Sequence, residues 1–143
     1  MQGFNDEQVI NGTWGELWFD GDYMAEVISC KGELTAEYTD IQRVQRLTKG
    51  KKLTGLEGSG EVKIHKVSSS IAKKVLTSFK NGKVPKYTII SKLSDPDNGG
   101  TERVAFYNCV IDKSILADWE AGKNGEETYS FTFTDAEYLD SID

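Results

Sequence analysis

The stretch that decides the fold runs from Ile28 to Thr39 and reads ISCKGELTAEYT. Its even-numbered positions carry mostly apolar or small residues, and its odd-numbered positions are all polar or charged. Because successive side chains of a strand point to opposite faces, this alternation predicts one long strand with one face on a core and the other in water. At roughly 3.3 Å per residue the strand would extend about 40 Å, whereas an ordinary strand has about 5–6 residues.

Two further segments repeat the alternation. In 57–65 every second residue is polar, and Val62 and Ile64 lie between them; in 128–134 threonine and serine alternate with aromatic residues. Three strands therefore predict one broad polar face. An antiparallel sheet with one solvated face explains it, and so does a large closed barrel around a water-filled channel.

If the polar face lines a channel, we expect the polar residues of the first two strands to face the lumen. These lumen-facing candidates are Lys31, Glu33, Thr35, Glu37, Glu57, Ser59, Glu61 and Lys63. Leu34 and Ile64 then belong to the core on the opposite face.

Length and composition indicate a single folded domain over residues 1–143, because 38% hydrophobic residues suffice for a core. The net charge of −6 argues against general nucleic-acid binding. No apolar run reaches membrane-spanning length. The start MQGFNDE lacks the basic and apolar regions of a secretory signal, so we expect cytoplasmic synthesis and two reduced cysteines.

Charge is unevenly distributed along the chain. Residues 41–54 contain five basic residues and no acid, whereas 112–143 contain nine acids and two lysines. Opposite charges at separate places suit head-to-tail contact between copies of one chain, and a solvated loop and tail are the alternative. The candidate inter-subunit arm consists of Arg43, Arg46, Lys49, Lys51 and Lys52.

The remaining sequence predicts a mainly β protein, an antiparallel sandwich or barrel with one flanking helix. The helix spans about 69–81, where an apolar stripe is followed by Lys80-Asn81-Gly82. Residues 40–54 are expected to form a projecting basic loop or hairpin. Residues 114–121 fit a helix or a strand, and the acidic tail is expected to be extended or partly ordered. Further strands are expected at 13–19, 22–27, 87–94 and 101–111, the first two joined by an Asp20-Gly21 turn.

No pattern in the sequence supports catalysis, a metal or a cofactor. His65 is the one histidine, and with Cys30 and Cys109 it offers no ligand pair at short spacing. Gly55-x-x-Gly58-x-Gly60 opens a strand and not a helix, so it is not a phosphate-binding loop; glycines inside a strand indicate bulges or close backbone approach.

The order of these segments resembles the tail tube proteins of contractile-tailed phages and phage-like particles, including R-type bacteriocins, and in particular the XkdM-like family. The matching features span nearly the whole chain. They are Gly12-x-x-Gly15-x-Leu17-x-x-Asp20-Gly21-x-x-Met24-Ala25, Thr54-Gly55-x-x-Gly58-x-Gly60, Lys66-Val67-x-Ser69, Thr101-Glu102-Arg103-Val104 and Phe131-Thr132-Phe133-x-Asp135.

The resemblance implies a structural protein without catalytic residues or cofactor. It implies six copies closing into a ring, rings stacking into a tube inside a sheath, and contact with a baseplate or tube initiator. The tube would assemble in the bacterial cytoplasm, end in the particle's tail and allow transient passage of DNA. The alternatives are the tube of a type VI-like secretion system and a small β-barrel that binds single-stranded nucleic acid through Trp14, Trp18 and the basic run 43–52.

Overall fold

The computed structural model describes residues 3–143. They form one α-helix, α1 (Ser70–Lys80), and two short 3-10 helices at Asp6–Gln8 and Gly12–Trp14. The strands are β1 (Gly15–Phe19), β2 (Asp22–Tyr23), β3 (Val27–Ile41), β4 (Gly50–His65), β5 (Tyr87–Leu93), β6 (Glu102–Ile111), β7 (Glu126–Phe133) and β8 (Asp135–Asp140).

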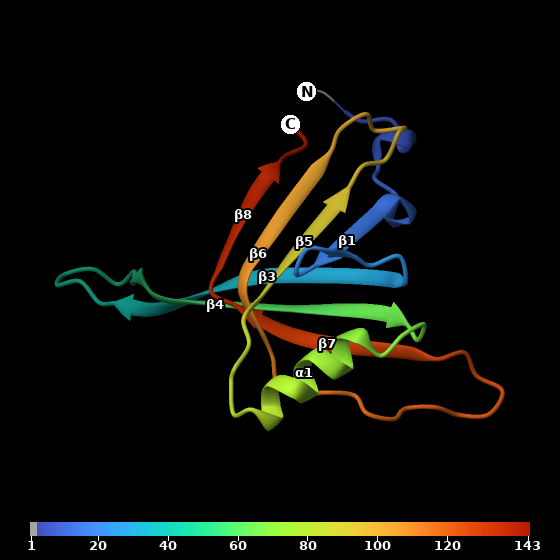
Figure 1. Cartoon of the computed structure of the whole chain (residues 1–143). Coiled ribbons are helices and arrows are strands. Elements are labelled where there is room, and N and C mark those ends of the chain that lie inside the picture. The colour runs from blue at the N-terminus through green and yellow to red at the C-terminus, as the bar shows by residue number, and fades with distance from the viewer. Residues whose placement is uncertain (1–2) are drawn as a thin grey trace.

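All strand pairs are antiparallel. The strand order is β2-β1-β5-β6-β7-β4-β3, and β8 pairs with β6 outside this order. Strand β6 belongs to two layers, because its first part pairs with β5 and β8 and only Val110 and Ile111 pair with β7. In Figure 1 the layer of β3, β4 and β7 crosses the layer of β1, β5, β6 and β8, and α1 lies on the side of β7 away from β3. The predicted β-sandwich with one flanking helix is confirmed.

The core fills the space between the two layers. Leu17 of β1, Ile89 of β5 and Ile111 of β6 are fully buried there. Strand β7 alternates strictly between exposed and buried residues, as the sequence predicts for 128–134. In β4, Val62 and Ile64 are likewise buried between exposed neighbours.

Glycines in β3 and β4 leave room for aromatic rings and for the backbone of neighbouring strands. A Cβ added to Gly60 would lie 2.6 Å from the carbonyl oxygen of Lys31 and would run into the ring of Phe131. No side chain fits there, so these strand glycines mark close backbone approach, one of the two readings that the sequence offers. The same contact occurs between Gly58 and Phe133 and between Gly32 and Phe106.

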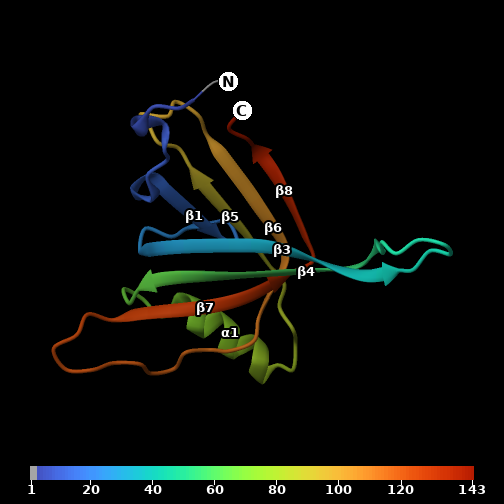
Figure 2. The ribbon, with the colours of Figure 1, turned by 180° about the vertical axis from the view of Figure 1, so that it is seen from behind.

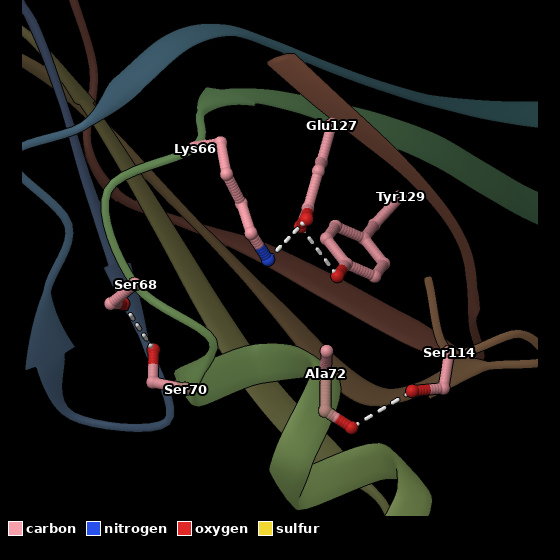
Figure 3. Close-up of polar contacts among 7 residues, drawn as sticks. All are labelled: Lys66, Ser68, Ser70, Ala72, Ser114, Glu127 and Tyr129. Atoms are coloured by element: carbon pink, nitrogen blue, oxygen red, sulfur yellow. Dashed lines mark hydrogen bonds and ion pairs between the residues drawn. The ribbon is translucent and has the colours of Figure 1, made fainter. Parts of the chain in front are cut away.

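A buried carboxylate fastens the segment before α1 to β7 (Figure 3). Glu127 is 4% exposed; it lies 2.5 Å from the ammonium of Lys66 and accepts a hydrogen bond of 2.8 Å from the Tyr129 hydroxyl. Burial and this hydrogen bond raise the pKa of Tyr129. The Ser114 hydroxyl donates a hydrogen bond of 2.8 Å to the carbonyl oxygen of Ala72, so the segment that follows β6 also holds α1 in place.

Most expected elements lie within a few residues of their predicted bounds. The Asp20-Gly21 turn has positive φ at both residues, as a two-residue hairpin turn requires. Residues 114–121 form neither helix nor strand. The acidic tail is more ordered than expected, because β8 pairs with β6 and Asp140 forms an ion pair with Arg103.

One core expectation is wrong. Leu34 is 55% exposed, whereas Ile64 is 3% exposed as predicted. Strands β3 and β4 extend beyond the second layer, so the apolar face of β3 loses its cover from Leu34 onward. An extra residue at the start of β3 also shifts the register and leaves Ile28 exposed.

Candidate lumen face and subunit contact surfaces

The predicted polar face exists, and it continues across three strands. The register places polar side chains side by side on β3, β4 and β7. We call this surface the polar face. Its rows include Lys31 with Glu61 and Ser130, and Glu33 with Ser59 and Thr132.

The polar face is hollowed and carries mixed charge. A depression of about 330 Å³ lies over it and reaches Asp112 after β6. Lys31 lies 3.9 Å from Glu33, and Lys63 lies 3.1 Å from Glu126, both in exposed positions. Pairs of this kind contribute little to stability, but they keep the surface hydrated.

The eight lumen-facing candidates share this face, but they are not all on the body of the protein. Thr35, Glu37 and Glu57 lie where the β3–β4 hairpin has left the second layer, and Glu37 is paired with Gly55 in the hairpin. Four of the eight are carboxylates, which we call the polar-face glutamates: Glu33, Glu37, Glu57 and Glu61.

The expected projecting hairpin is present. Residues 36–56, which we call the arm, continue β3 and β4 away from the body, as Figures 1 and 2 show from opposite sides. A bulge leaves Thr54 without a partner, and its hydroxyl donates to the carbonyl oxygen of Glu37 at 3.2 Å. The five basic residues predicted for this arm are all exposed, and none forms an ion pair within residues 3–143.

The arm also carries an apolar face that the sequence analysis missed. Tyr38 lies opposite Leu53, and Ala36 lies opposite Leu56, on the side that continues the core-facing surface of β3. Tyr38, Leu53 and Leu56 are all exposed. A contiguous apolar strip of this kind usually marks an interaction site.

A groove follows β3 where the two layers separate, and we call it the β3 groove. It has a volume of about 410 Å³. Its walls come mainly from β3, β6 and β8, with one residue each from β5 and β7. The acidic residues at the groove are Glu33, Glu102 and Glu137, and no basic residue of the described chain lines it. The apolar lining consists of Cys30, Leu34, Val104, Phe106, Phe133, Ala136 and Tyr138.

The outer edge of β3 is unpaired along the strand's whole length. In the described chain β3 pairs with β4 alone, so the backbone groups on its other side have no ladder partner. Long free edges invite pairing with another chain. At the far side of the same layer, β7 pairs with β6 only at Phe131 and Thr132.

Both cysteines are free thiols, Cys109 buried and Cys30 half-buried. Burial raises the pKa of the Cys30 thiol to about 11 and that of Cys109 to about 12, so both remain protonated at neutral pH. Within residues 3–143 no three histidine, cysteine or acidic residues gather as metal ligands. His65 is exposed on the polar face.

The structure does not bring together the parts of a nucleic-acid site. Trp18 packs against Tyr23, with ring centroids 5.5 Å apart, on the hairpin of β1 and β2. The basic arm leaves the body at the opposite end, as both ribbon views show. No helix in residues 3–143 has the length and hydrophobicity needed to cross a membrane.

Comparison with known proteins agrees with this geometry. The XkdM protein of the phage-like element PBSX from Bacillus subtilis is 30% identical over 131 residues, which are 90% of this chain and 89% of XkdM. The fold matches a chain in the sheath–tube complex of the PVC extracellular contractile injection system, with a TM-score of 0.72, 9% identity and coverage of 97% and 100% of the two chains. It also matches a chain in the tail of a gene transfer agent particle with C6 symmetry, with a TM-score of 0.54, 13% identity and coverage of 98% and 100%.

The family comparison is the most direct. Residues 2–140 match the family described as phage tail tube protein. That match covers nearly the whole chain and includes the polar face, the arm and the β3 groove. The chain belongs to the phage tail tube protein family.

Proposed function

We propose that this protein forms the inner tube of a contractile tail, as hexameric rings that stack around a water-filled lumen lined by the polar face. The observation that carries the proposal is the continuous polar surface of β3, β4 and β7, bordered by the free edge of β3. Strands from neighbouring copies can extend this layer into a closed barrel, which removes the exposed edges.

The number six and the contractile machinery rest on structural relatives. The gene transfer agent tail that shares this fold has C6 symmetry, and the PVC chain is part of a sheath–tube complex. By analogy, the partners of this chain are further copies of itself, a sheath protein and a baseplate or initiator protein. Assembly would take place in the bacterial cytoplasm, and the finished tube would be part of the particle's tail.

The chemistry of the polar face fits transport through the tube. Among the eight lumen-facing candidates, four carboxylates stand against two lysines. A polyanion such as DNA gains most of its affinity from basic clusters that release its counterions. A lumen of this composition would let DNA pass without retaining it.

Electron microscopy tests the proposal. Concentrated purified protein, with a baseplate extract as initiator where needed, should form rings or tubes with a stain-filled centre. Native particles from the producing bacterium should contain this chain as the tube. Particles in which the tube density is traced to another polypeptide would contradict the proposal.

A further inference from the structure

The β3 groove is an incomplete part of the protein core. Val104 and Phe106 of β6 and Tyr138 of β8 face it, and Tyr138 is exposed although its register places it beside Val104. The layer that should cover these residues ends at β3, whose outer edge is free. A further strand or hairpin laid along β3 would close the sandwich at this point.

The arm has the surface that such a covering element needs. Its apolar strip of Tyr38, Leu53 and Leu56 faces water in a single copy. The arm cannot fill the groove of its own chain, because it continues β3 outward and leaves the body (Figures 1 and 2). The arm of another copy can reach it.

Charge favours the same pairing. Residues 41–54 carry five basic residues and no acid, and none of the five is in an ion pair within the described chain. No basic residue of the described chain lines the groove, and Glu102 shares the face of β6 that carries Val104 and Phe106. The other two acids at the groove are directed elsewhere, because Glu33 belongs to the polar face and Glu137 accepts a hydrogen bond from the Tyr107 hydroxyl. Glu102 is half-buried on the groove side of β6, with no cation within 4.0 Å among residues 3–143. A lysine from a neighbouring arm would give this carboxylate its missing partner.

We propose that the β3 groove of each copy holds the arm of an adjacent copy, with the apolar strip of the arm completing the core and a basic residue of the arm facing Glu102. Arm and groove are different patches, so the contact is heterologous and repeats from copy to copy. This inference rests on the proposed tube function and names the surface through which the tube grows.

A charge-swap experiment tests the pairing. Glu102→Lys should reduce the fraction of protein in sedimentable tubes by about tenfold or more, because like charges then meet in the contact. Lys51→Glu should do the same, and the two changes together should restore tubes to within about threefold of the unmodified protein. The matched control is Glu61→Lys, which makes the same charge change on the polar face and should leave tube yield unaltered.

Circular dichroism and thermal unfolding of each variant show whether the monomer is folded. A photo-crosslinking residue in place of Leu53 gives a second readout that does not depend on charge. In assembled tubes of the variant it should label peptides containing Val104 or Tyr138 of another copy. If the groove variant assembles normally, or if the label appears only on other surfaces, the pairing is wrong while the tube function stands. If the unmodified protein and native particles show no tube of this chain, the tube function itself fails.

Discussion

Truncating Leu34 or Ile64 to alanine should affect different properties of the protein. Ile64→Ala should mainly lower the stability of the monomer, and Leu34→Ala should mainly lower the yield of assembled tubes. Ile64 is 3% exposed, so Ile64→Ala removes packed atoms from the core and should lower the free energy of unfolding by about 2–5 kcal/mol. Leu34 is 55% exposed in a single copy. A fully buried leucine contributes about 1.5–3 kcal/mol, so Leu34→Ala should cost the monomer about 1 kcal/mol or less.

The two variants differ again when the protein assembles. Leu34 lines the β3 groove, so its truncation should reduce tube yield although the monomer remains nearly as stable as the unmodified protein. Urea unfolding of dilute monomer, followed by tryptophan fluorescence, gives the stability difference, and sedimentation of concentrated protein gives the yield. Equal losses of stability for the two variants would show that Leu34 is already covered in the monomer. An unaltered tube yield for Leu34→Ala would show that the groove is not a contact.

Three further predictions follow from single features of the fold. Gly60→Ala should lower the free energy of unfolding in urea by about 1–3 kcal/mol, because the added Cβ would meet the backbone of the neighbouring strand. A Cβ added at Gly12 would have no atom within 4 Å, so Gly12→Ala should be nearly neutral. Equal effects of the two changes would contradict the close-approach argument. Burial raises the pKa of Cys30 from 9.0 to about 11, so the protonated thiol contributes stability below pH 9 that is lost as the pH rises toward 11. The free energy of unfolding should therefore fall over this pH range, and it should fall less steeply in Cys30→Ala. Equal slopes for the two proteins would refute the assignment. Replacing the polar-face glutamates by lysine should leave the fold intact but make assembled tubes retain DNA in a salt-dependent way; tubes that release DNA as before would contradict the lumen assignment.

The sequence predicts which residues share a face better than it predicts whether that face is covered. Alternation correctly places Val62 and Ile64 in the core and Glu61 on the polar face, because period two is a local property of a strand. The exposure of Leu34 depends on where the opposite layer ends. That position is set by β8 pairing with β6, a contact between residues about 30 positions apart that no local pattern contains.

The sequence predicts the arm in part and the β3 groove not at all. The basic run correctly indicates a projecting hairpin, since a charged segment of that length has no place in a core. Its apolar strip is hidden in the sequence because the bulge at Thr54 breaks the alternation between Leu53 and Leu56. The β3 groove combines residues of strands that are distant in the chain, so only the folded protein brings Glu102 and Tyr138 to the same groove.

A cryo-EM map of the tube formed by this chain tests the central claim most directly. The account predicts that Glu33, Ser59 and Glu61 line a central channel and that Ile64 lies inside the wall. It also predicts that strands of neighbouring copies continue the layer of β3, β4 and β7 around the channel. A map with Leu34 and Ile64 on the channel wall and the glutamates inside the protein would contradict it.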